Sequence, residues 1–331
     1  MEPERAMRAD RSVTRRRFLG VAAGLAGGGA LHAAGSPTAE DELQVPPGRA
    51  PSRVVEVRAP HVVRGPKIHE TLLREMLDRL VQSLTDKTST RGAWRSILRQ
   101  DDVIGLKFNR SGQNQIGTSG AVARVVVASL AEAGWPPDRV VCIEAPADVE
   151  ASLGTTPARA GYETVATHFE SGSDQLATVL NQVTALINIP YLKTHNITGI
   201  TGALKNLSHG LIKHPARFHG NGCSPFIADI VALPRIRGKL RLCLVDALRV
   251  AYDGGPERIA EALDDAGVLL ASTDPVATDA VGLAVINELR RRRELPRIAR
   301  SAADLGFLAD AHRRNLGVAV VHGIDLVRVE P

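Results

Sequence analysis

The sequence predicts an α/β fold in which a mostly parallel, buried sheet is flanked by helices and divided into two closely packed lobes. Short apolar segments alternate with longer segments whose apolar residues recur at helical spacing, a pattern typical of parallel sheets with buried strands. The 331 residues suffice for one large domain or two intimate ones. Hydrophobic residues make up 44% and aromatic residues only 3%, so we expect a core of Ala, Val, Leu and Ile.

Strands are expected where short apolar runs end at turn or polar residues, and helices where apolar residues recur three or four positions apart. The second helix begins at Ser119 and ends at Gly134, a residue frequent after helix ends. Asp274 and Pro275 predict another start, because aspartate caps a first turn and proline fits its first position. The expected strands are residues 103–108, 140–143, 185–189, 240–245, 268–271, 318–321 and 326–329. The expected helices are residues 69–84, 119–134, 176–183, 227–233, 257–263, 274–293 and 301–315.

Residues 1–35 are interpreted as a twin-arginine signal peptide. Residues 14–19 read Thr-Arg-Arg-Arg-Phe-Leu, the order found in such signals, and a weakly apolar run at 21–34 follows. A disordered basic tail is the alternative. The proline-rich residues 36–52 are expected to form a flexible linker to an α/β domain at residues 53–331. No stable transmembrane span is expected, because a span takes about 20 apolar residues.

This signal predicts export by the twin-arginine machinery to the periplasm or another site outside the cytoplasm. The route carries folded proteins, which favours a cofactor that is bound before export. The signal also accounts for most of the charge. Six arginines and three acidic residues lie in residues 1–34, so this segment holds +3 of the total +5 and the rest holds +2. The remaining basic run, residues 290–293, ends a predicted helix, where cations are favourable, so no nucleic-acid partner is expected.

The densest polar stretch, residues 189–206, follows a predicted strand, and the ends of strands carry the chemistry of open α/β sheets. Gly199 and Gly202 permit close backbone approach, and Thr201 could cap the turn that follows. Lys205 would then lie near the amides of a helix start, an arrangement that suits phosphate or carboxylate. A glycine-rich turn with a surface lysine is the alternative. Lys107 and Lys193 also end predicted strands, where they would meet an anion or reach water.

Histidines are concentrated in the same region. Four of the ten, His195, His209, His214 and His219, fall within 25 residues. Residues five apart on a helix do not share one face, so a helical zinc pair is not expected. A metal site built from loops, or a set that binds substrate, remains open.

Other polar residues have two interpretations each. Asp246 and Asp253 would bind metal or act as a general base, or would only shape a turn. Asp279 would face the cleft or solvent, whereas capping alone explains Asp274. Cys223 lies four residues after His219 and would form a metal pair with it or remain a free thiol.

Taken together, several segments resemble the domain-of-unknown-function family 362 over about residues 54–300. Some members carry ferredoxin-type clusters, so the resemblance implies an iron–sulfur association. Here the chain has three cysteines without a Cys-x2-Cys pair, and a ferredoxin cluster takes four thiolates, so none is expected. The odd count also argues against a disulfide framework. The segments are Lys107-Phe108-Asn109, Leu192-Lys193-Thr194-His195, the Thr-Gly-Ala-Leu-Lys-Asn run ending at Asn206, His219, Asp229, Val245-Asp246, Gly255-Pro256 and residues 272–279.

A shorter stretch is similar to the nickel-pincer lactate racemases. It comprises His195, Gly199, Thr201, Gly202 and Lys205 at matching spacing. In that family the histidine and lysine flank a pincer nucleotide cofactor, which the lysine holds covalently. The resemblance implies that His195 is a metal ligand or proton carrier.

The sequence therefore predicts an exported protein that binds a small anionic molecule or a metal cofactor in a strand-end cleft. With a bound metal or cofactor, the protein would be an enzyme that depends on it. The alternative is a non-catalytic periplasmic binding or accessory protein. His195 and Lys205 are the candidate catalytic residues, and His195 and His219 the candidate metal ligands. The residues expected to bind the cofactor or anion are Lys107, Asn109, Lys193, Thr201, Gly202 and Asn206.

Overall fold

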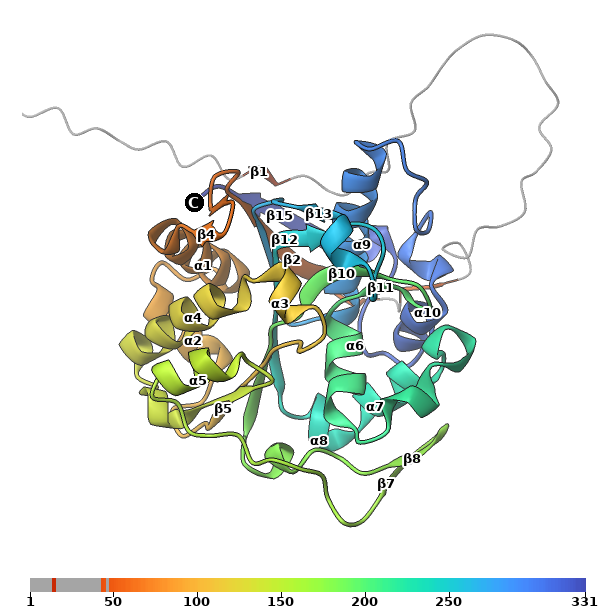
Figure 1. Cartoon of the computed structure of the whole chain (residues 1–331), viewed down its shortest axis with the longest axis horizontal. Coiled ribbons are helices and arrows are strands. Elements are labelled where there is room, and N and C mark those ends of the chain that lie inside the picture. The colour runs from red at the N-terminus through yellow and green to blue at the C-terminus, as the bar shows by residue number, and fades with distance from the viewer. Residues whose placement is uncertain (1–13, 16–42, 46–47) are drawn as a thin grey trace, which may run out of the picture.

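The computed structural model describes residues 14–15, 43–45 and 48–331 (Figure 1). Most of the predicted signal peptide and part of the predicted linker lie outside these residues. Strand β1 (Thr14–Arg15) pairs antiparallel with β15 (Ile324–Val329). Within the predicted linker, Leu43 is buried and belongs to a hydrophobic core.

One large sheet runs through the domain in the order β1-β15-β2-β14-β12-β9-β5-β6, with β10, β11 and β13 joined beside β12. Parallel pairing joins β6, β5, β9 and β12, and also β10 to β12 and β15 to β2. Strand β14 joins β12 and β2 with antiparallel pairing. The bounds are β2 Ser52–Arg58, β5 Ile104–Lys107, β6 Val140–Ile143, β9 Ala185–Asn188, β10 Tyr191–His195, β11 Gly199–Thr201, β12 Leu240–Ala251, β13 Leu263–Asp264 and β14 Val268–Ser272. Two short hairpins stand apart, β3 Val63–Arg64 with β4 Lys67–Ile68 and β7 Thr167–Phe169 with β8 Gly172–Asp174.

Helices cover both faces of this sheet. Figure 1 shows α1, α2 and α4 on one side and α6, α7, α9 and α10 on the other. Each layer closes its own hydrophobic core, because successive strand residues point to opposite faces. The bounds are α1 Glu70–Thr85, α2 Thr90–Ile97, α3 Gln113–Ile116, α4 Ser119–Ala133, α5 Ala147–Ser152, α6 Ala203–Ser208, α7 Phe226–Ala232, α8 Pro234–Arg237, α9 Pro275–Arg291 and α10 Gly306–Arg313.

The predicted fold class is confirmed, with a mostly parallel central sheet and flanking helices. The predicted start of α9 is also confirmed. Asp274 accepts hydrogen bonds from the amides of Val276 and Ala277, both at 2.9 Å. Its other oxygen accepts the amide of Val318 and the hydroxyl of Ser52, so this carboxylate also ties the two chain ends of the domain to α9.

Three predicted elements are wrong, because their backbone groups bond elsewhere. Residues 257–263 keep only the 3₁₀ helix Ile259–Glu261, since Leu263 begins β13, which pairs with the end of β12. Residues 318–321 are not a strand, because the amides of Val318 and Ala319 bond to the side chains of Asp274 and His312. Residues 176–183 keep only the 3₁₀ helix Thr178–Asn181, since Leu176 and Ala177 bond to the backbone near Leu211.

Smaller corrections concern helix ends. The expected helix 301–315 is divided at Leu305 into the 3₁₀ helix Ala302–Asp304 and α10. The basic run at the end of α9, residues 290–293, is not wholly solvated, because Arg290 is buried and bonds to Asp253 and to two carbonyls. Among the described residues, no helix combines the length and apolar character needed to cross a bilayer.

Candidate functional site

The hairpin of β10 and β11 places several of the predicted site residues together. Lys193 pairs with Thr201 across the hairpin, and His195 pairs with Gly199. Since side chains alternate along a strand, Lys193, His195 and Thr201 lie on one face. All three are buried, and the Thr201 hydroxyl has no hydrogen-bond partner among the described residues. His195 therefore stands at the end of a paired strand, where the sequence placed a loop.

Helix α6 and the loops after it bring further polar side chains to this face. Lys205 Nζ lies 3.3 Å from His219 Nε2 and 3.7 Å from Cys223 Sγ. The His219 ring stacks against His195 with centroids 6.0 Å apart, and it meets His209 edge-on at 4.6 Å. His214 lies elsewhere and pairs with Asp174. We call the assembled set the hairpin site. It consists of Lys193, His195, Thr201, Lys205, His209, His219 and Cys223.

Two buried ammonium groups dominate the electrostatics of the hairpin site. Burial and, as the second cause, the nearby charge of Lys205 together lower the pKa of Lys193 to about 8. Burial also lowers the pKa of Lys205. Lys193 donates to the backbone carbonyl and hydroxyl of Ser111, and Lys205 contacts only His219 and Cys223. In the part of the chain that the structure describes, no carboxylate forms an ion pair with either ammonium.

The hydrogen bonds of His195 determine which ring nitrogen carries its proton. Its Nδ1 accepts the backbone amide of Ile197 at 3.1 Å and that of Thr198 at 3.5 Å. Burial, together with the charges of Lys205, His219 and Lys193, lowers the pKa of His195 to about 3. The neutral ring therefore holds its proton on Nε2. This tautomer favours hydrogen-bond donation by His195 over the metal-ligand role that the resemblance to the nickel-pincer racemases implied.

His209, His219 and Cys223 are the described residues best placed to hold a metal ion. Each offers one ligand atom, and these atoms lie within 4.8 Å of one another. His219 bonds through Nδ1 to the carbonyl of Pro215 at 3.0 Å, which leaves its Nε2 lone pair facing Lys205. Two imidazoles and a thiolate with one open position form a ligand set that zinc and similar ions accept. The Lys205 ammonium contacts two of the three donors, so a bound cation requires it to move.

The cysteines do not fit a ferredoxin-type cluster. The sequence has three, one fewer than such a cluster takes. Cys142 and Cys243 are buried within β6 and β12, and burial raises the pKa of both thiols. We therefore derive no chemistry through an iron–sulfur cluster.

Lys107 and Asn206, both predicted to bind a cofactor, are occupied by a buried network next to the hairpin site. Lys107 Nζ donates to the Phe108 carbonyl, to Glu144 Oε2 at 2.8 Å and to Asn206 Oδ1 at 2.9 Å. Asn206 in turn donates to Asn188 and to the Lys107 carbonyl. All three protons of the ammonium are thus used within the protein. The sequence analysis missed Glu144, although its place directly after β6 is the signal that could have found it.

Gly202 and Asn109 also have internal partners. Asp279, from α9, accepts the amides of Ala203 and Leu204 at 2.5 and 3.0 Å and so caps the start of α6. A side chain at Gly202 would collide with this carboxylate. The helix amides that the sequence assigned to a ligand are therefore bonded to Asp279. Asn109 accepts the amide of Ser111 at 3.0 Å, which shapes the loop whose Ser111 holds Lys193.

The remaining candidate carboxylates are structural. Asp246 is buried and accepts the Thr118 hydroxyl at 2.5 Å and the amide of Leu248. Burial raises its pKa to about 6. Asp253 forms an ion pair with Arg290 at 2.7 Å. These contacts agree with the turn-forming alternative for both residues.

Comparison with known families gives one match. A family model described as domain of unknown function, DUF362, matches residues 104–284, which run from β5 into α9. The matched segment contains the hairpin site, the Lys107 network and Asp279. No curated protein matches the chain significantly.

The cap on α6 predicts a distinctive dependence of stability on pH. Burial raises the pKa of Asp279 to about 7, against about 4 in an unfolded chain. Between these pH values the folded state binds more protons than the unfolded chain. The contribution of Asp279 to the free energy of unfolding therefore falls as the pH rises from about 4 to 7. Its slope approaches about 1.4 kcal/mol per pH unit. Asp279→Asn should remove this component.

Urea unfolding of both proteins from pH 4 to 8 measures the effect as the difference between their free energies of unfolding. The matched control is Asp101→Asn, because Asp101 is exposed and its side chain has no partner among the described residues. A wild-type minus Asp279→Asn difference that stays constant over this range would refute the prediction.

Proposed function

The chain belongs to the DUF362 family, whose description assigns no activity, and we propose from the geometry of the hairpin site that it binds a small anionic molecule there. The observation that supports this most directly is the pair of buried ammonium groups without a carboxylate. Lys193 is 1% and Lys205 7% exposed. A buried charge without a counter-ion costs several kcal/mol, so an anion that enters between these groups gains their interaction and relieves that cost.

The side chains of the site have complementary roles in this proposal. Lys193 and Lys205 supply positive charge, and the Nε2–H of His195 and the Thr201 hydroxyl supply directed hydrogen bonds. A carboxylate or a phosphate accepts all of these. Lys193, whose pKa is about 8, can also take up or release a proton near neutral pH. Lys193 is accordingly our candidate for proton transfer if the bound molecule reacts.

The first prediction concerns affinity for lactate, chosen as a small hydroxycarboxylate. Lys205→Met and Lys193→Met each remove one positive charge and keep an unbranched side chain of similar length. Each should weaken lactate binding at least tenfold, about 1.4 kcal/mol, in isothermal titration calorimetry. His195→Asn, which keeps an acceptor near the Ile197 amide but removes the Nε2 donor, should weaken binding less.

The control is Lys87→Met, since Lys87 is exposed and distant in sequence from the hairpin site. Lactate binding that is the same in Lys205→Met as in the wild type would exclude the hairpin site as the anion site. Binding by the wild type without any conversion of L-lactate to D-lactate would favour the non-catalytic binding protein over a racemase.

A second candidate function, metal-dependent chemistry, is favoured by the ligand set of His209, His219 and Cys223. When bound there, a divalent cation would supply Lewis acidity next to the anion site. The protein's own contribution would be the three ligands and the adjacent Lys193 and His195. Such a cation and the Lys205 ammonium compete for His219 Nε2 and Cys223 Sγ. The two functions therefore make opposite predictions for Lys205→Met: weaker binding of the anion, but tighter binding of the cation.

Cobalt(II) is the probe for that competition, because its coordination by thiolate gives absorption in the near ultraviolet and visible regions. Lys205→Met should bind cobalt(II) at least tenfold more tightly than the wild type, since it removes a positive charge that contacts both donors. Cys223→Ser in the same background should lose the thiolate absorption, whereas Cys142→Ser should keep it. An affinity unchanged by Lys205→Met would contradict the competition.

We further propose that the protein acts outside the cytoplasm after export by the twin-arginine route. The support is the order of residues 14–19 and the apolar run after them. Replacing Arg15, Arg16 and Arg17 together by lysine should abolish export, measured as the fraction of protein in the periplasm. Replacing Arg5 and Arg8 by lysine is the matched control and should leave export unchanged. Export at the wild-type level after the triple change would refute the assignment.

A further inference from the structure

Buried lysines of this protein differ in how many hydrogen-bond acceptors surround the side-chain nitrogen. A lysine ammonium carries three protons, whereas the neutral amine carries two protons and a lone pair. Lys107 Nζ donates to three acceptors, one of which is the carboxylate of Glu144 at 2.8 Å. The surroundings of Lys107 therefore match an ammonium in both the number of protons and the charge.

The surroundings of Lys193 match the neutral amine instead. Its Nζ has two acceptors among the described residues, the backbone carbonyl of Ser111 and the Ser111 hydroxyl, the latter at 3.0 Å. Both are neutral oxygens, so the third proton of an ammonium is left without an acceptor. The charge of Lys205 acts on the same nitrogen and further disfavours the ammonium. Lys193 can therefore release a proton without losing a hydrogen bond, and the amine that remains has a free lone pair.

An amine in such surroundings is a nucleophile toward carbonyl groups. Lysines that form imines with carbonyl substrates are activated when they are withdrawn from water or lie beside a second cation. Lys193 meets both conditions, because it is 1% exposed and Lys205 lies nearby. The site thus contains an amine and, next to it, a separate positive charge for an anionic substrate.

The hydrogen-bond donors near Lys193 select the kind of carbonyl compound. Thr201 pairs directly with Lys193 across the hairpin, and its buried hydroxyl has no partner among the described residues. His195, on the same face of the strand, presents its Nε2–H. Together with Lys205, these groups suit a carboxylate. In a 2-oxo acid the carbonyl carbon is bonded directly to the carboxylate, so one small molecule can occupy these donors and bring its carbonyl to Lys193.

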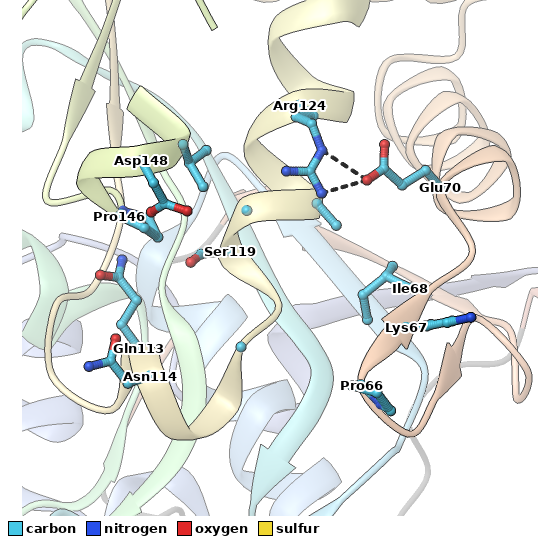
Figure 2. Close-up of a pocket in the computed structure, with 14 residues that line it drawn as sticks. Pro66, Lys67, Ile68, Glu70, Gln113, Asn114, Ser119, Arg124, Pro146 and Asp148 are labelled. Carbon is cyan, nitrogen blue, oxygen red and sulfur yellow. Dashed lines mark hydrogen bonds and ion pairs between the residues drawn. The ribbon is translucent and has the colours of Figure 1, made fainter. Parts of the chain in front are cut away.

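The loop after β5 covers the Lys193 nitrogen. Ser111 is exposed, and a Cβ at Gly112, where φ is +86°, would lie 3.2 Å from Lys193 Nζ. The next residues, Gln113 and Asn114, line a surface pocket of about 590 Å³ at the start of α4 (Figure 2). The loop therefore borders solvent on its outer side. A ligand that replaces Ser111 as the partner of Lys193 does not have to cross the hydrophobic core.

We propose that Lys193 forms an imine with the carbonyl carbon of a small 2-oxo acid. This inference rests on the anion site proposed above, since Lys205, His195 and Thr201 must hold the carboxylate. The Lys193 nitrogen bonds to the carbonyl carbon, and the π pair of the C=O bond moves to the oxygen, which takes one amine proton. The C–O bond of this carbinolamine then breaks, and the hydroxyl group leaves as water with the second amine proton. Nitrogen and carbon end with a double bond, and no oxidant or reductant takes part.

Trapping by reduction tests the proposal. The whole chain is incubated with pyruvate and sodium cyanoborohydride, which converts an imine into a stable secondary amine, and peptide mass spectrometry locates the modified lysine. Lactate is the matched ligand, because it has the same carbon skeleton and carboxylate but no carbonyl. We expect a carboxyethyl group on Lys193 with pyruvate, at least tenfold more than on the exposed Lys87, and none with lactate.

Two variants separate the amine from the carboxylate donors. Lys193→Arg keeps a positive charge but has no amine that can form an imine, so labelling at position 193 should be lost. Lys205→Met keeps Lys193 and removes a carboxylate donor, so labelling of Lys193 should fall at least tenfold. Lys87→Met is the control and should leave the labelling of Lys193 unchanged. Circular dichroism verifies folding, and Lys205→Met decides the question if Lys193→Arg does not fold.

The imine and the anion site fail separately in these experiments. Calorimetric binding of lactate and pyruvate without labelling of Lys193 would overturn the imine and keep the anion site. Binding of neither ligand would overturn both. Labelling of Lys107 or Lys205 in place of Lys193 would overturn the assignment of the amine. Labelling of Lys193 that is the same in Lys205→Met as in the wild type would overturn the role given to Lys205.

Discussion

The arrangement of the candidate site depends on one carboxylate, that of Asp279. It reaches from α9 and accepts the first two amides of α6, at a position where only glycine can precede the helix. Asp274 caps α9, the helix that carries Asp279. The position of α6 therefore depends on α9, and the start of α9 depends on Asp274. Because α6 carries both Lys205 and Asn206, this contact sets the position of an ammonium in the hairpin site and of an amide in the Lys107 network.

The buried lysines Lys107, Lys193 and Lys205 have different roles because their side chains have different partners. Glu144 and Asn206 satisfy Lys107, so it joins β5, the loop after β6 and α6. Lys193 and Lys205 are also buried, but among the described residues neither forms an ion pair with a carboxylate. Our proposal of an anion site at the hairpin therefore rests on buried charge that lacks a counter-ion, not on buried charge alone.

The sequence predicts most strands of the sheet and the long helices, because apolar spacing and the Asp274–Pro275 cap are local signals, but it does not predict β2 or β10. It also places residues 189–206 directly after a strand, which is β9 in the structure. It does not predict that Asp279 occupies the α6 amides or that Glu144 reaches Lys107, since both contacts join residues far apart in sequence. For the same reason it extends a helix to residue 263, although Leu263 pairs with the end of β12.

The loop after β5 lies between the hairpin site and the pocket at the start of α4. Ser111 holds the Lys193 ammonium on one side, and Gln113 and Asn114, two and three residues later, line the pocket at α4 on the other. An anion that draws Lys193 away from Ser111 removes a restraint on this loop. The order of the loop after β5 therefore depends in part on the Lys193 ammonium remaining at Ser111.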